Sequence, residues 1–262
     1  MCSQPTGPAG ACAPRRSDRS SPMHRFFVIR GFHLGDDVRF TAAQARQMTR
    51  VLRMGVGARC VSFDGSGREW EVEIVAVSPR EVVGRVVAEC APRRESSLRV
   101  VLLQGLLKGS KMDFVIQKAT EMGVAGIVLL ATKRTVPEGS GKVVRWGRIA
   151  VEAAEQSGRV TVPPVTGPHT LETAGLGSTA GVKLVLWEGA PVGSLAPLLD
   201  GLPPPRDVVI LVGPEGGLEA EEVALLTGRG FVPVSLGPRV LRAETAALAA
   251  LAILQHRWGD LR

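Results

Sequence analysis

From about residue 96 onward, short apolar runs alternate with amphipathic segments, and this alternation constrains the fold more than any other feature of the sequence. Apolar runs of strand length are predicted at 98–107, 124–131, 182–187, 207–213 and 231–236. Helical segments are predicted at 110–122, 145–157, 218–227 and 244–258. Strands that are apolar throughout and separated by helices are typical of a parallel sheet covered on both faces. We therefore predict an α/β domain over residues 96–262.

The preceding segment, residues 23–92, has a different pattern. Short strands, divided by Gly and Ser-Pro turns, are predicted at 28–29, 59–63, 69–77 and 81–89. One helix interrupts them, with Thr41 as its N-cap and Gly55 beyond its end. Several strands and one helix in a segment of this size predict a small β-barrel domain, joined to the α/β domain by a linker at residues 91–97.

Residues 1–22 are rich in Pro, Gly, Ser and Arg, and they carry too little apolar surface to offset the entropy of ordering. We expect a disordered tail and no signal peptide. The longest apolar run, 246–254, is far shorter than the ~20 residues of a membrane helix, so no membrane partner is expected. The 4 cysteines show no C-x-x-C spacing, which predicts neither a metal site nor a disulfide framework and indicates a cytoplasmic protein.

Three of the predicted strands end in glycine-rich or basic loops, at 187–189, 213–217 and 236–242. Ligands of parallel sheets bind beyond the carboxyl ends of the strands, and glycine lets the backbone approach them closely. The helix after the second loop opens with Glu219, Glu221 and Glu222, whose carboxylates disfavour a phosphate at that terminus. A ligand that has no phosphate or that carries positive charge fits better, and S-adenosylmethionine with its sulfonium is one. Tight turns without a ligand are the alternative for each loop.

Residues 244–254 are so rich in Ala and Leu that the predicted helix is apolar on nearly every side. Such a helix must be enclosed, either by its own sheet or by a second subunit. We favour shared burial at a dimer interface. The net charge of +7 permits a polyanionic partner without requiring one.

Six segments together resemble the bacterial 16S ribosomal RNA (uracil-N3)-methyltransferases, the RsmE family of the SPOUT superfamily. They are GPEGGL (213–218), LGPRVLRAETA (236–246), EQSGR (155–159), KGSKMDFVIQK (108–118), RVLRM (50–54) and GDL (259–261). The resemblance covers residues 23–262.

The resemblance implies a SPOUT-type parallel sheet with a C-terminal trefoil knot, an N-terminal PUA-like barrel that grips RNA, and a homodimer that packs through the knot and the C-terminal helix. It implies S-adenosyl-L-methionine as cofactor, bound mostly through backbone groups of the three loops. The implied cofactor-binding residues are Leu186, Trp187, Glu188, Val212, Gly213, Pro214, Glu215, Gly216, Gly217, Leu236, Gly237, Val240, Leu241, Arg242, Thr245 and Ala246.

The implied reaction is methylation of N3 of one uridine in the 16S rRNA of the small ribosomal subunit. Because N3 must lose a proton, Glu244 is a candidate proton acceptor, and Arg242 is a candidate for stabilising the charge on the uracil oxygens. Their alternative roles are a first-turn carboxylate and its ion-pair partner. Candidate RNA-binding residues are Arg25, Arg50, Arg53, Arg134 and Arg159, since arginine suits phosphates and unpaired bases.

Two other functions stay open. A noncatalytic RNA-binding or ribosome-assembly factor would need the barrel and its arginines but not the three glycine loops. A SPOUT enzyme that acts on another RNA nucleoside, such as a 2′-O-methyltransferase, would keep both. Cofactor binding separates the first alternative, and analysis of the methylated nucleoside separates the second.

Overall fold

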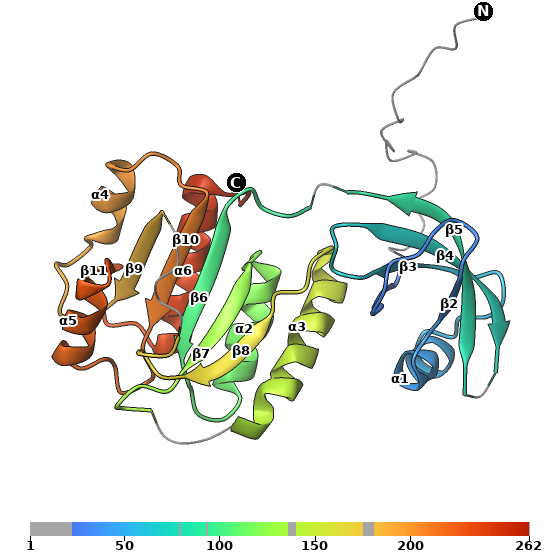
Figure 1. Cartoon of the computed structure of the whole chain (residues 1–262), viewed down its shortest axis with the longest axis horizontal. Helices are drawn as coiled ribbons and strands as arrows, with labels where there is room; N and C mark the ends of the chain where they lie inside the picture. The colour runs from blue at the N-terminus through green and yellow to red at the C-terminus, as the bar shows by residue number, and fades with distance from the viewer. Residues whose placement is uncertain (1–22, 79, 93, 136–139, 175–180, 262) are drawn as a thin grey trace, which may run out of the picture. The chain divides into compact units, whose positions relative to one another are not determined.

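The computed structural model describes residues 23–78, 80–92, 94–135, 140–174 and 181–261 (Figure 1). The predicted tail, residues 1–22, lies outside them. The chain divides into two compact units after Pro92. Among the described residues, no helix is long and apolar enough to cross a membrane.

The first unit is built on a five-stranded sheet in the order β1-β3-β4-β5-β2. Its strands are β1 (Arg25–Phe27), β2 (Asp37–Arg39), β3 (Arg59–Phe63), β4 (Glu69–Val77) and β5 (Val82–Cys90). Alternate residues of these strands turn inward, and Phe26, Trp70 and Val72 form a core with the helix residue Met48. The predicted strand at 28–29 lies instead at β1, because Arg25–Phe27 is the segment that pairs with β3.

The helix of this unit begins where the sequence predicts. Thr41 and Gln44 form a capping box, and α1 (Ala42–Arg46) follows. The helix then widens into a π-helical turn, η1 (Gln47–Val51), and Arg53 just beyond it has a positive φ of 52°. Both features are rare and occur most often at functional sites.

The second unit is the predicted α/β domain. Its six strands are all parallel to their neighbours, in the order β11-β9-β10-β6-β7-β8. They are β6 (Arg99–Gly105), β7 (Gly126–Leu130), β8 (Val165–His169), β9 (Val182–Leu186), β10 (Asp207–Val212) and β11 (Val232–Val234). The knot implied by the family resemblance stays a prediction.

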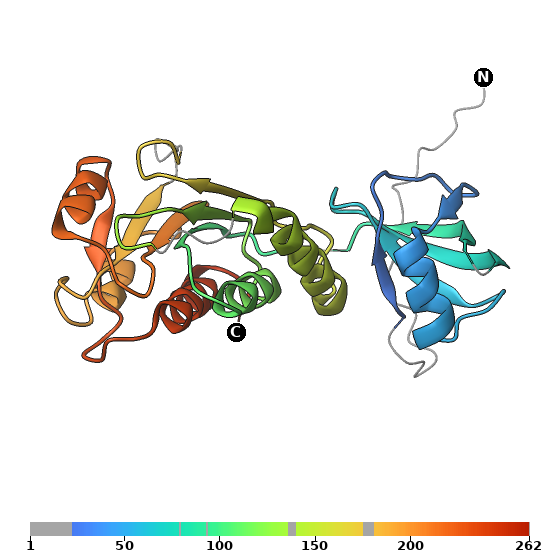
Figure 2. The same cartoon turned by 90° about the horizontal axis from the view of Figure 1, so that it is seen from below.

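Helices cover both faces of this sheet (Figure 2). The helices are α2 (Lys111–Glu121), α3 (Val143–Ser157), which follows the 3₁₀ turn η2 (Ser140–Lys142), α4 (Leu195–Asp200), α5 (Ala220–Gly228) and α6 (Ala243–Trp258). α2, α3, α4 and α6 pack on one face, and α5 packs on the other. Three elements were not predicted from the sequence: the short β2, the edge strand β8 and the six-residue α4. All three are too short or too polar to show a clear hydrophobic period.

Candidate active site

A cavity of about 490 Å³ opens at the carboxyl ends of β9, β10 and β11, where the three glycine-rich or basic loops meet. The loops follow these strands directly, so the parallel sheet itself brings them together. Residues in the first turn of α6, and Lys111 at the start of α2, complete the wall. A pocket of this size suits a cofactor or a nucleoside.

The cavity contains nearly all of the residues predicted to bind the cofactor, because all of them except Thr245 line it. Arg242 and Glu244 line it too. Lining residues that the sequence analysis did not select are Lys111, Val192, Leu218, Val234, Ser235, Pro238, Arg239 and Ala243. Lys111 and Arg239 are the charged residues in this list, and residue type alone does not distinguish them from the many other lysines and arginines of the chain.

The glycines of the 213–217 loop are required by protein contacts as well as by space for a ligand. Gly217 has a φ of 72°, and a Cβ there would lie 3.0 Å from Glu188 Oε1. A Cβ on Gly216 would lie 3.0 Å from the Cβ of Arg134. In contrast, a Cβ on Gly237 meets no atom within 4 Å, and its φ is not in the left-handed region. Gly237 therefore leaves open space within the pocket wall.

The 213–217 loop is braced on one side by the turn before α2. The Glu215 carboxylate accepts hydrogen bonds from the Lys108 backbone N–H at 3.1 Å and from Lys111 Nζ at 3.0 Å. Burial alone raises the pKa of the Glu215 carboxyl group, but these hydrogen bonds outweigh it, and the pKa lies below its ordinary value. Glu215 therefore stays ionised and holds Lys111 at the pocket.

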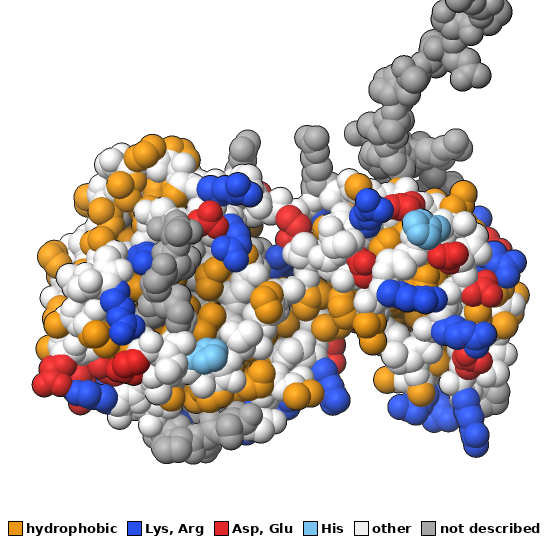
Figure 3. Space-filling model, in the orientation of Figure 1, with side chains coloured by type: hydrophobic (Ala, Val, Ile, Leu, Met, Phe, Trp, Pro, Cys, Tyr) orange, Lys and Arg blue, Asp and Glu red, His pale blue; other side chains and the backbone are white. Residues whose placement is uncertain are grey.

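On its other side, the loop is braced by residues 133 and 134. Arg134 Nη1 donates to the Gly216 carbonyl at 2.9 Å, and the Lys133 backbone N–H donates to Glu222 Oε1 at 2.9 Å. The Lys133 ammonium pairs with Glu219 at 3.1 Å and with Glu221. Figure 3 shows acidic and basic side chains side by side in the region of α5. Arg134, predicted to bind RNA, thus holds the pocket loop in place.

Glu244 has an unusual environment for a carboxylate. Its Oε2 is buried and has no hydrogen-bond partner among the described residues. Arg242 is exposed, and the described residues show no ion pair between it and Glu244. The ion pair considered as an alternative role for these two residues is therefore absent from the described part of the chain. A buried, unpaired carboxylate oxygen in a pocket is costly, which points to a partner supplied by a ligand.

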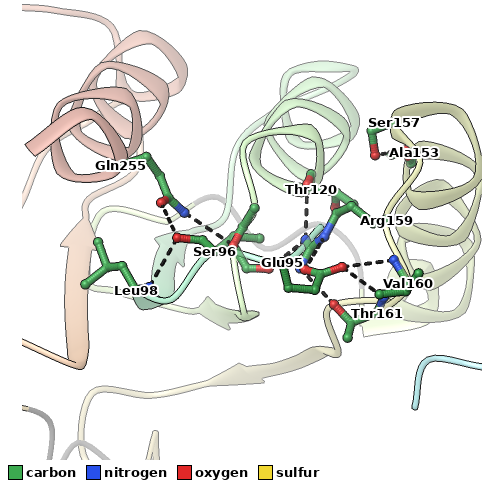
Figure 4. Close-up of polar contacts among 12 residues, drawn as sticks. Glu95, Ser96, Leu98, Thr120, Ala153, Ser157, Arg159, Val160, Thr161 and Gln255 are labelled. Atoms are coloured by element: carbon green, nitrogen blue, oxygen red, sulfur yellow. Dashed lines mark hydrogen bonds and ion pairs between the residues drawn. The ribbon is translucent and has the colours of Figure 1, made fainter. Parts of the chain in front are cut away.

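Arg159 lies away from this pocket and is 6% exposed (Figure 4). Its guanidinium pairs with Glu95 at 2.7 Å and donates to the carbonyls of Thr120 and Val124. Glu95 also accepts from the Val160 and Thr161 N–H groups. The RNA-binding role predicted for Arg159 is not supported, because its donors are engaged inside the protein. Sequence alone gave no sign of a partner 64 residues away.

Arg25 differs from its prediction for the same reason. It pairs with Glu69 at 2.6 Å, and both side chains are 10% exposed. Its guanidinium also lies 5.1 Å from the centre of the Phe63 ring. It therefore stabilises the barrel instead of facing solvent. Arg50 and Arg53 are exposed, as a role in RNA binding requires.

Comparisons with known proteins agree with this geometry. Residues 94–255 match the RNA methyltransferase domain family, and residues 40–87 match the RNA methyltransferase PUA domain family. Ribosomal RNA small subunit methyltransferase E of Synechocystis is 36% identical over 82% of this chain and 71% of its own length. Its Bacillus subtilis namesake is 32% identical over 85% of this chain and 91% of its own length.

Among solved structures, the S-adenosyl methionine complex of ribosomal RNA small subunit methyltransferase E from Neisseria gonorrhoeae superposes with a TM-score of 0.83. It is 32% identical, over 92% of this chain and 100% of that one. A parallel α/β domain with this pocket, carried beside a PUA domain, defines an RNA methyltransferase. The chain belongs to the ribosomal RNA small subunit methyltransferase E family.

Proposed function

We propose that this protein transfers a methyl group from S-adenosyl-L-methionine to N3 of a uridine in the 16S rRNA of the small ribosomal subunit. The observation that carries this proposal is the pocket itself, where the half-buried Glu244, whose Oε2 has no hydrogen-bond partner among the described residues, and the exposed Arg242 lie in one loop-and-helix segment. The names of the relatives support the substrate, and from such a substrate we infer that the enzyme works in the cytoplasm.

The pocket suits S-adenosylmethionine in both size and charge. Residues of the three strand-end loops line the cavity, and Gly237 leaves room for a ligand. Glu188 and Glu244 supply carboxylates that suit the positive charge of the cofactor. The loop residues that line the cavity, from Leu186 to Glu188, Val212 to Gly217 and Leu236 to Arg242, would hold it. When bound, the cofactor supplies an electrophilic methyl group on sulfur.

The chain's own residues deal with the proton and the charge. As the N3–carbon bond forms, the methyl–sulfur bond of the bound cofactor would break and leave its electron pair on sulfur. The N3–H bond breaks as well, and we assign its proton to Glu244 Oε2, which has no hydrogen-bond partner among the described residues. Negative charge spreads to the flanking uracil oxygens, where the Arg242 guanidinium stabilises it more in the transition state than in the neutral ground state. Arg242 is free to do this, since no described carboxylate pairs with it.

The barrel contributes an RNA-binding surface on its helix. Arginines on or beside the strands are neutralised by carboxylates: Arg39 by Glu81, Arg59 by Glu71 and Glu73, Arg68 by Glu89, and Arg85 by Asp37. In contrast, Arg46, Arg50 and Arg53 are exposed and pair with no acidic side chain among the described residues. Figure 3 shows basic side chains at the α1 end of this unit. Arginines without a protein counterion suit RNA phosphates.

We further propose a homodimer that packs through α6. This helix buries Ala247, Ala250, Leu251 and Leu254 against its own sheet, but Ile253 on another side is 37% exposed. Together with Ala196, Leu199 and Ala252, Ile253 lines a mostly apolar depression of about 370 Å³ between α4 and α6. An apolar surface of this kind is suited to a second copy of the same helix.

Methyl transfer to defined RNAs tests the proposal. The protein is incubated with labelled S-adenosylmethionine and, separately, with unmodified small subunits, naked 16S rRNA and large subunits. We expect label in the RNA of the small subunits when the enzyme is present, and no label in reactions that lack the enzyme or contain large subunits in place of small subunits. Cofactor binding without transfer to any of the three RNAs would contradict the proposal, and so would RNA binding without cofactor binding, the behaviour of an assembly factor.

A further inference from the structure

Arg239 lines the pocket, yet nothing in the protein explains its charge. Six charged residues line the cavity: Lys111, Glu188, Glu215, Arg239, Arg242 and Glu244. Lys111 and Glu215 neutralise each other, and Glu244 has a buried carboxylate oxygen without a hydrogen-bond partner among the described residues. Arg239 is exposed and makes no ion pair with any residue in the described part of the chain.

The loop that carries Arg239 is fixed at its base and exposed at its tip. Ser235 Oγ accepts from the Gly237 N–H at 3.3 Å and donates to the Gly237 carbonyl at 3.1 Å. The Ser235 N–H donates in turn to Ser194 Oγ at 3.0 Å. Beyond this anchor, Val240 is 86% exposed. The loop therefore presents Arg239 from a rigid base without using it to hold the fold.

The chemistry of the substrate supplies a reason for this charge. A nucleotide that reaches the pocket with its base carries a phosphodiester on each side, and these anions stay in solvent at the mouth. An exposed guanidinium at the mouth makes paired hydrogen bonds to such a phosphate, and no protein carboxylate competes for it. Glu244 within the pocket thus suits the cationic cofactor, and Arg239 at its mouth suits the anionic RNA.

We propose that Arg239 is a positioning residue that binds a backbone phosphate next to the target nucleotide. This inference rests on the proposed RNA methylation and goes beyond it, because it assigns a residue that binds the substrate without touching the reacting atoms. Arg242 acts on the uracil oxygens, whereas Arg239 acts on the phosphate and so on the affinity for RNA.

The test compares Arg239→Ala with Arg206→Ala. Arg206 is also exposed, but it directly precedes β10. It therefore lies at the amino ends of the strands, opposite the pocket. For Arg239→Ala we expect KM for small-subunit RNA to rise about 3- to 10-fold, and the slope of log affinity against log salt to fall by about 0.7 to 1. The single-turnover rate at saturating RNA and the Kd for S-adenosylmethionine should stay near those of the wild type. Arg239→Lys should restore the salt slope and only part of the affinity.

Three results would overturn the inference: an unchanged salt slope in Arg239→Ala, an equal effect in Arg206→Ala, or a loss of cofactor affinity that accounts for the change in KM. RNA binding is measured by fluorescence anisotropy as well as by turnover. If the wild type binds RNA but transfers no methyl group, the proposed function fails, while the salt slopes still decide the role of Arg239.

Discussion

Gly237→Val is the sharpest test of where the cofactor binds. The added Cβ meets no protein atom within 4 Å, and the residue does not need a positive φ, so the fold tolerates the side chain. We expect a change in the free energy of unfolding within about 0.5 kcal/mol. A cofactor that fills this part of the pocket would be crowded by the new methyl groups. Crowding of a packed site costs about 1–3 kcal/mol, which is a rise in Kd of roughly 5- to 150-fold.

The assay is isothermal titration calorimetry with S-adenosylmethionine, accompanied by a thermal melt of each variant. Gly55→Val is the matched control, because Gly55 also faces open space without a positive φ and does not line the pocket. Gly216→Val is less informative, since its Cβ would press on Arg134 and disturb the loop directly. A folded Gly237→Val protein that binds the cofactor as tightly as the wild type would refute the site assignment.

Further predictions concern Glu244, the pair of Arg159 and Glu95, and Gly147. Glu244→Gln should slow single-turnover methylation at saturating cofactor by roughly 10²–10⁴; a wild-type rate would show that Glu244 accepts no proton. Arg159→Met should cost about 3–5 kcal/mol in urea unfolding, because it leaves Glu95 half-buried without its cation. Burial raises the pKa of the Glu95 carboxyl group, but its contacts with Arg159 lower the pKa by more, so the folded pKa lies below the unfolded value of about 4.3. The ion pair therefore stabilises the wild type above that pH, and this stabilisation is lost as the pH falls through the folded pKa. A free energy of unfolding that does not change with pH in this range would contradict the prediction. Gly147→Ala, inside α3 and facing open space, should raise the free energy of unfolding by about 0.5–1 kcal/mol, and a loss of stability would show that the position is crowded.

The sequence predicts the regular elements wherever one face or both faces are buried. β10 is buried at five consecutive positions, and α3 ends at Gly158, which has a φ of 78°. Caps are less predictable. Thr41 accepts the hydrogen bond expected of an N-cap, whereas the side chain of Ser110, which stands at the N-cap position of α2, makes no capping hydrogen bond. The short strand β2 was missed, since three residues are too few to establish a period.

The pocket could be located from sequence because each of its loops follows an apolar strand in a parallel sheet, which fixes the edge where they meet. The arginines could not be sorted in the same way. Arg25 and Arg159 lie in buried pairs with Glu69 and Glu95, residues 44 and 64 positions away along the chain, whereas Arg50 and Arg53 stay exposed. Only tertiary packing decides between these environments, so a residue's type cannot show whether its charge is neutralised.

The identity of the methylated atom decides whether this protein is a uracil-N3 methyltransferase. Small subunits that lack the modification are methylated by the purified protein under single turnover, and their RNA is digested to nucleosides and separated by liquid chromatography with mass detection. We expect the wild type to form one new product, N3-methyluridine, and Glu244→Gln to form it at a rate lower by a factor of roughly 10²–10⁴. A 2′-O-methylated nucleoside, a methylated base other than uracil, or no methylated product at all would contradict it.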